Sequence, residues 1–291
     1  MDIIMYQSIF IKENNISLEL NDIKEKIDIK EEDIAFLSGS LIESIIKKTS
    51  KNMGNRLSDI DVFIITKNIE SYNGNRLDIK GKRHKTLFRK INNINLDIEI
   101  YDEETIHSLI NQLNKYEPTI INKKINSIIK PPEEIGLFNF CSFLHRMLNS
   151  ICLYNENKYE ILKDSVRWNL YYKFMTRLSI NKVENMFDDI IGNLEVMEYE
   201  VALILARDML LETIKAYIFY NKESVDRKKW ISLKFYDISR KDLYTKELYD
   251  KFVELNFYNS IKSNSQYEEN IKAIIRFSNK LIDEICLNSA L

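Results

Sequence analysis

The sequence predicts an α+β protein of two domains, with a small sheet in residues 1–130 and an all-helical bundle in residues 131–291. Six Gly and three Pro in 291 residues allow few tight turns, which argues against a β-sandwich or barrel and favours helix. Short apolar strands occur before Lys130, whereas apolar residues at helical spacing fill the chain after it. Lys130-Pro131-Pro132 marks the boundary, because proline interrupts regular backbone hydrogen bonding.

Alternating strand and helix patterns make up the first domain. The predicted helices are 3–12, 17–30 with Ser17 as the cap, 41–48, 103–113 and 120–129, and the predicted strands are 33–38, 60–66 and 96–101. The second domain shows apolar spacing of three and four throughout. Its predicted helices lie near 134–153, 158–178, 194–220, 241–257 and 266–286, and the most apolar stretch, 201–211, is expected at the centre of the bundle.

Acidic residues interrupt two of the apolar strands. Asp59 and Asp61 are one residue apart, as are Asp97 and Glu99, so each pair projects to one face of its strand. Carboxylates held side by side repel one another, and a hard divalent cation would neutralise them. Three such carboxylates on adjacent strands can hold two magnesium ions against a triphosphate.

Gly39-Ser40 follows the strand at 33–38 and opens a helix. Backbone amides, a hydroxyl and the positive end of a helix dipole together suit a phosphate group. Carboxylates beside such a cradle indicate chemistry on a nucleoside triphosphate.

Over residues 33–101 these motifs resemble the nucleotidyltransferase superfamily of DNA polymerase beta, and more closely its small bacterial antibiotic nucleotidyltransferases of the kanamycin and lincosamide type. The resemblance implies a nucleotidyltransferase core with a small mixed sheet. It also implies that Gly39 and Ser40 grip the β and γ phosphates and that Asp59 and Asp61 bind both Mg²⁺ ions. Asp97 would be the third carboxylate, completing the metal site on the side of the attacking nucleophile.

Further residues are candidates for nucleotide contacts. The stretch from Gly54 to Ser58 resembles the family's approach to the aspartates, and we take Arg56 and Ser58 in it as cofactor-binding residues. Lys215 would reach a phosphate if its helix lined a cleft, although a salt-bridge ladder with Asp208 and Glu212 also explains its spacing.

Two other features have alternative interpretations. Glu99 either takes part in catalysis, as a general base or as a residue that supports a catalytic group, or forms a structural ion pair with the basic segment 76–90. That segment, with seven basic side chains, is either a solvated hairpin or a contributor to triphosphate binding. The three histidines are dispersed, which favours ordinary surface or core roles.

Composition limits the class of partner. Lys plus Arg (42) and Asp plus Glu (44) nearly cancel, so the chain lacks the excess positive charge of a protein that tracks nucleic acid. Three scattered cysteines do not make a disulfide framework or a zinc site. No apolar run approaches the ~18 residues that span a bilayer, and we expect a cytoplasmic monomer or homodimer without membrane association.

The sequence therefore predicts an enzyme, a Mg²⁺-dependent nucleotidyltransferase (EC 2.7.7-type) that moves a nucleoside monophosphate from ATP or another triphosphate to a hydroxyl of a small molecule, such as an antibiotic or a biosynthetic intermediate. One alternative is transfer to nucleotides, to transfer RNA or to a protein, as in signalling or toxin-antitoxin systems. Another is a nucleotide-binding regulator without turnover.

Overall fold

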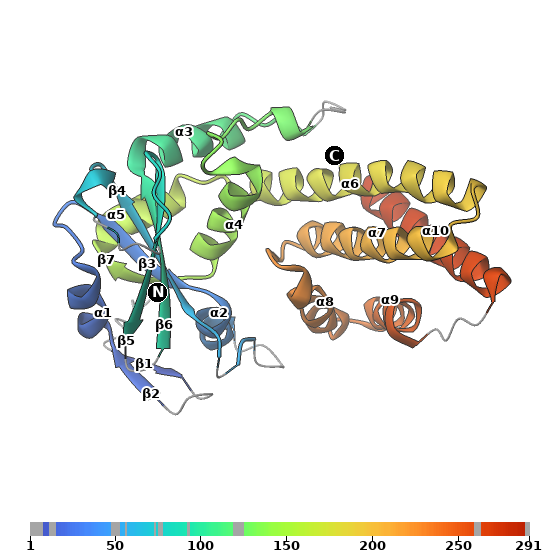
Figure 1. Cartoon of the computed structure of the whole chain (residues 1–291), viewed down its shortest axis with the longest axis horizontal. Helices are drawn as coiled ribbons and strands as arrows, with labels where there is room; N and C mark the ends of the chain where they lie inside the picture. The colour runs from blue at the N-terminus through green and yellow to red at the C-terminus, as the bar shows by residue number, and fades with distance from the viewer. Residues whose placement is uncertain are drawn as a thin grey trace. The chain divides into compact units, whose positions relative to one another are not determined.

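The computed structural model divides into two compact units (Figure 1). It describes residues 8–11, 16–47, 53–55, 57–72, 74, 78–91, 94–118, 125–258 and 263–288. The first unit comprises Met1–Gln112 with Lys130–Val166, and the second comprises Leu113–Ile129 with Arg167–Leu291. This division differs from the predicted boundary at Lys130, because the chain beyond the prolines returns to the sheet of the first unit before it enters the helical unit.

A five-stranded mixed sheet forms the centre of the first unit. Its strands are β3 (Ile34–Ser38), β4 (Ile60–Thr66), β5 (His84–Ile91), β6 (Ile94–Asp102) and β7 (Ile151–Tyr154). They lie in the order β5-β6-β4-β3-β7, with β4 and β6 parallel and the other neighbours antiparallel. The α+β prediction is confirmed, as are the three strands on which it was based.

The two faces of the sheet have different cores because side chains alternate along each strand. On one face, aliphatic residues of the strands join those of the helices α1 (Leu20–Ile27) and α2 (Ser40–Lys47). This cluster includes Ile23, Ile27, Leu37, Leu41, Ile42, Ile60, Val62, Ile64, Leu96, Ile98 and Ile100.

The opposite face of the sheet carries aromatic rings. Phe36 of β3 stacks on Phe63 of β4 at 5.0 Å between ring centroids, and Tyr101 of β6 extends the row. Phe143, from the helix α4 (Gly136–Leu148), covers the row and lies 5.0 Å from Tyr101. Tyr159, from α5 (Glu156–Asp164), packs on Phe36. Asp61, Asp97 and Glu99 alternate in phase with these rings, so they occupy the same face of the sheet.

The predicted helix 3–12 is wrong at residues 8–11, and the predicted helix 17–30 is confirmed only over residues 20–27. Residues 8–11 and 16–19 form an antiparallel pair of strands, β1 (Ser8–Ile11) and β2 (Ile16–Glu19), and helix α1 begins only at Leu20. Ile9 and Leu18 are directly paired and buried. These apolar residues therefore belong to the buried face of a hairpin and not to the apolar face of a helix. Ser17 pairs with Phe10 in the hairpin and caps no helix. Residues 3–7 lie outside the described part.

The predicted helix 134–153 is also partly wrong. Helix α4 ends at Leu148, and the next segment forms β7 at the edge of the sheet, beside β3 (Figure 1). Four residues are too short for a period-two pattern to be told from helical spacing. The helix at 103–113 is confirmed as α3 (Glu103–Asn114).

A buried tyrosine–aspartate contact lies at one end of β3. The Tyr72 hydroxyl donates a hydrogen bond to the Asp33 carboxylate, which also accepts one from the backbone N–H of Lys30, and both side chains are buried. Burial, and then the hydrogen bond and charge of Asp33, raise the pKa of Tyr72.

Removing this hydroxyl in Tyr72→Phe is expected to lower the free energy of unfolding by ~1–3 kcal/mol, because a buried carboxylate loses a donor. Chemical denaturation checks this, with Tyr199→Phe in the second unit as the control, and a loss no larger than the control's would contradict it. The raised pKa of Tyr72 means that its stabilisation is fully present below the ordinary tyrosine pKa of about 10 and declines as the pH rises above it.

The second unit is a bundle of helices. They are α6 (Trp168–Glu195), α7 (Tyr199–Tyr220), α8 (Ile231–Ser239), α9 (Leu243–Val253) and α10 (Asn264–Asn288). Helix α7 contacts α6, α8 and α10, which confirms its predicted central place. Of the predicted helix 120–129, residues 125–127 form a 3₁₀ turn and 120–124 lie outside the described part. Within the described ranges, no helix has the length and apolar character of a membrane span.

Candidate active site

Three carboxylates lie close together at one end of strands β4 and β6. The parallel register pairs Asp61 with Asp97, so their side chains leave the same face of the sheet as direct neighbours. Asp59 directly precedes β4, and its Oδ1 accepts a hydrogen bond of 3.0 Å from Asn95 Nδ2, two residues before Asp97 on β6. Parallel pairing of two strands thus brings together residues that are far apart in the sequence.

The carboxylates repel one another. Burial, and then the negative charges of Asp59 and Glu99, raise the pKa of Asp97. The Asp97 side chain therefore holds its negative charge in a place that disfavours it. A cation beside Asp97 would relieve that repulsion.

Asp61 has a partner that sequence reasoning missed. Arg146 Nη1, from helix α4, donates a hydrogen bond of 2.7 Å to Asp61 Oδ2, and the side chains are only 11% and 21% exposed. The Ser38 hydroxyl on β3 lies 2.9 Å from the carbonyl oxygens of both Arg146 and Asn149, which ties this end of α4 to the sheet. The two residues of the ion pair are 85 positions apart, and no local pattern in the sequence marks Arg146.

Gly39 lets the Asp61 carboxylate approach the start of α2. Gly39 has φ of +103°, and a Cβ placed on it would lie 2.3 Å from Asp61 Oδ2. Ser40 follows Gly39 directly and begins α2. Gly54, with φ of +86°, also comes close, because a Cβ there would lie 3.0 Å from Ser40 Oγ. Gly39 of the predicted phosphate cradle therefore lies beside Asp61, and phosphate binding there stays a prediction.

Ser58 has a local role in the structure. Its Oγ accepts a hydrogen bond of 2.9 Å from the Asn55 backbone N–H, and its own N–H donates to the Asn55 carbonyl. These bonds shape the turn that leads to Asp59. Arg56, the other predicted nucleotide contact in this turn, lies outside the described residues.

Glu99 of β6 is held by a residue of its own strand and by one of the neighbouring strand β5. The Tyr101 hydroxyl donates a hydrogen bond of 2.5 Å to Glu99 Oε2, and His84 Nε2 lies 3.7 Å from the same oxygen, beyond hydrogen-bond length. Burial alone would raise the pKa of Glu99, but its interactions with His84 and Tyr101 and the charge of Arg146 together lower it. His84 belongs to the basic segment 76–90. Its contact with Glu99 therefore agrees with the interpretation of Glu99 as part of a structural pair with that segment.

The basic segment supplies further structural contacts. It contains strand β5, and Lys85 is buried with Nζ 3.0 Å from both the Ile69 carbonyl and Glu70 Oε2. Arg89 Nη1 lies 3.2 Å from Asp78 Oδ2. These contacts favour the hairpin interpretation for Lys85 and Arg89 over triphosphate binding, whereas Arg76 lies outside the described residues.

The carboxylates have the donor chemistry that Mg²⁺ prefers, namely oxygen ligands that carry negative charge. Among the described residues, no group of three or more His, Cys, Asp or Glu side chains is arranged to hold a metal ion. In the structure Asp61 is bonded to Arg146, and Asp59 is bonded to Asn95. The donor set fits a divalent cation in kind, and the side chains would have to rearrange to bind one.

Lys215 lies in the second unit, on α7, and is buried. Nearby on that helix, Asp208 and Glu212 pair with lysines from outside it, Lys228 at 2.6 Å and Lys182 at 3.8 Å. The prediction that Lys215 binds a phosphate stays a prediction.

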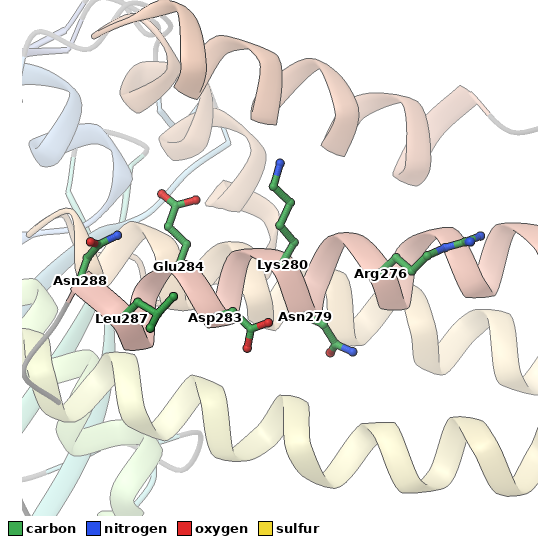
Figure 2. A pocket seen from close by; sticks show the side chains of 7 residues that line it. All are labelled: Arg276, Asn279, Lys280, Asp283, Glu284, Leu287 and Asn288. Atoms are coloured by element: carbon green, nitrogen blue, oxygen red, sulfur yellow. The ribbon is translucent and has the colours of Figure 1, made fainter.

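Figure 2 shows a pocket in the second unit, lined by α10. Lys280 and Glu284 point to one side of the helix and Asn279 and Asp283 to the other. One helix with exposed polar side chains offers no convergent set of reactive groups, so we assign the candidate site to the carboxylates of the first unit.

No known family model matches this sequence. The chain is 26% identical over 210 residues to a putative type I restriction enzyme MjaVIIIP endonuclease subunit of Methanocaldococcus jannaschii. That match covers 68% of this chain but only 17% of the archaeal protein. In structure the chain is similar to a nucleotidyltransferase-like protein from Exiguobacterium sibiricum, with a TM-score of 0.47 and 11% identity, over 89% of this chain and 73% of the other. The assignment of a function therefore depends on the site itself.

Proposed function

We propose that the protein is a Mg²⁺-dependent nucleotidyltransferase that moves a nucleoside monophosphate, with ATP as the default donor, to a hydroxyl group and releases pyrophosphate. The observation that carries the proposal is the pairing of Asp61 with Asp97 next to Gly39-Ser40. A metal-binding pair of carboxylates and a phosphate-binding helix start in one place suit a triphosphate and few other ligands.

Each residue has a distinct task in this proposal. Asp59, Asp61 and Asp97 would hold Mg²⁺, which neutralises phosphate charge and lowers the pKa of an attacking hydroxyl. Gly39 leaves room for backbone close to the phosphates, and Ser40 and the first amides of α2 receive their oxygens. The aromatic row that contains Phe63 and Tyr101 forms an apolar wall on the same face, which strengthens charge interactions beside it.

Glu99 is better placed for support than for proton abstraction. Its carboxylate is already bonded by Tyr101 and adjacent to His84, so one oxygen is engaged. As a support, it would add negative charge near the cation bound by Asp97. We keep general-base catalysis by Glu99 as the alternative, distinguished by whether Glu99→Gln retains measurable turnover.

For the acceptor we propose a small molecule, such as an antibiotic or a biosynthetic intermediate, because the positive and negative charges of the chain nearly cancel. Nucleotides, transfer RNA or a protein are the alternative acceptors. The likeness to a putative restriction endonuclease subunit is the reason to include DNA among the acceptors tested. We propose a cytoplasmic location, consistent with three free cysteines.

A pyrophosphate-release assay tests the proposal. Each nucleoside triphosphate is supplied with Mg²⁺ and a panel of aminoglycosides, lincosamides, sugars, transfer RNA and DNA, and Asp61→Ala serves as the inactive control. We expect release that depends on one acceptor class and is absent in the variant. If Mg²⁺ and ATP bind but no pyrophosphate is released with any acceptor, a regulator without turnover is favoured. Full activity in Asp61→Ala would refute the site.

A further inference from the structure

The ion pair between Arg146 and Asp61 is fixed by the fold on both sides. Asp61 is on a central strand of the sheet, and Arg146 is on a helix whose end is tied to β3 by the Ser38 hydroxyl. Next to it on α4, His145 Nε2 lies 3.4 Å from Glu43 Oε2 of α2, and both of these side chains are only 3% exposed. Helix α4 is therefore attached both to β3 and to α2, so the position of Arg146 among the carboxylates is set by the packing of the first unit.

Arg146 is also close to the start of α2. A Cβ on Gly39 would lie 3.4 Å from Arg146 Nη1 and 2.3 Å from Asp61 Oδ2. The guanidinium charge reaches Glu99 as well, since it contributes to the lowered pKa of that carboxyl group. A positive group thus lies close both to a candidate metal ligand and to the candidate phosphate cradle.

The oxygen of Asp61 that accepts a bond from Arg146 at 2.7 Å is a poor ligand for a divalent cation while the guanidinium stays in place. The guanidinium and the cation would then lie beside the same carboxylate and repel one another. The planar guanidinium has several donors, so it can exchange a carboxylate oxygen for a phosphate oxygen of similar geometry.

We propose that Arg146 is a counter-ion which Asp61 exchanges for the divalent cation, and that the released guanidinium binds a phosphate oxygen of the nucleotide. This inference rests on the proposed function and adds a phosphate-binding residue to it. Its consequence is that the metal ion and the nucleotide bind cooperatively, because the nucleotide offers Arg146 a new partner when the cation takes Asp61.

Binding of Mn²⁺ as a spectroscopic substitute for Mg²⁺, measured from the electron paramagnetic resonance of the free ion, tests the proposal without turnover. In Arg146→Met, Mn²⁺ alone should bind about tenfold more tightly than to the wild type, because Asp61 loses its competing cation. ATP in the presence of Mn²⁺ should bind about tenfold more weakly, because a charge-assisted bond to phosphate is lost. Arg89→Met, which breaks the pair between Arg89 of β5 and Asp78, is the matched control and should change neither affinity.

Arg146→Lys is the second variant, in case the shorter apolar side chain impairs folding, which circular dichroism would show. Lysine keeps the positive charge but lacks the planar fork, so Mn²⁺ affinity should stay near the wild-type value while ATP affinity falls. Unchanged Mn²⁺ and ATP affinity in folded Arg146 variants, with a wild type that binds ATP, would overturn this inference and leave the proposed function standing. A wild type that binds no triphosphate with any divalent ion would overturn both.

Discussion

Replacing Asp97 with asparagine is expected to abolish turnover while the fold is retained. Asp97 is the carboxylate that β6 places beside Asp61, and its pKa is raised by burial and by the charges of Asp59 and Glu99. Loss of its charge removes a ligand for the cation, and metal-borne charge stabilisation is worth several kcal/mol, so kcat should fall at least ~10³-fold. Loss of the same charge also removes a repulsion, so the thermal midpoint should stay the same or rise.

This opposite effect on activity and stability separates a binding role for Asp97 from a structural one. Pyrophosphate release and thermal unfolding are measured on the same preparation of Asp97→Asn. Asp22→Asn, at an exposed position of α1, is the control and should leave both unchanged. A variant that loses activity together with several degrees of thermal midpoint would show that Asp97 supports the fold, contrary to our assignment.

Gly39→Ala is expected to have the second largest effect. A side chain at φ of +103° is strained, and its Cβ would meet Asp61 Oδ2 at 2.3 Å, so Asp61 or the start of α2 must shift. We expect a loss of about 2 kcal/mol or more in the free energy of unfolding. A displacement of a catalytic group by about 1 Å can lower the rate by ~10²-fold, so kcat should fall by at least that factor.

Gly192→Ala provides the matched control. Gly192 is exposed within α6, and a Cβ there would meet nothing within 4 Å. In a helix alanine is favoured over glycine by about 0.5–1 kcal/mol, so this variant should be slightly more stable and equally active. If Gly39→Ala behaved like Gly192→Ala, the close approach of Gly39 to Asp61 would have no importance for the site.

The central strands were predictable because they are apolar over nearly their whole length. Strand β4 is buried at six of its seven positions, so it reads as a continuous apolar run that only Asp61 interrupts. The same run identified Asp61 as unusual, since a charged side chain in a buried strand needs a partner. Strand and candidate site were therefore predictable from one observation.

Short elements were not predictable in the same way. Strands β1, β2 and β7 have four residues each, and their apolar positions fit helical spacing as well as a period of two. Their pairing partners decide between the two, and β7 gains its partner only after α4 brings the chain back to β3. The boundary predicted at Lys130 differs from the division into units for this reason.

Contacts between polar residues that are distant in the chain also could not be predicted from the sequence. Arg146 sits in an amphipathic helix whose buried residues are mostly apolar, and nothing adjacent marks it as the partner of Asp61. The contact between Glu43 and His145 is of the same kind, since each residue alone resembles an ordinary helical position. Such pairs follow from how α2 and α4 pack on the sheet.

A crystal structure of the protein with Mg²⁺ and a non-hydrolysable ATP analogue tests the central claim most directly. We predict a metal ion at about 2.1 Å from carboxylate oxygens of Asp61 and of Asp59 or Asp97. We also predict phosphate oxygens at Ser40 and the first amides of α2. A nucleotide bound elsewhere in the chain, with Asp61 still paired to Arg146, would contradict the assignment of this site.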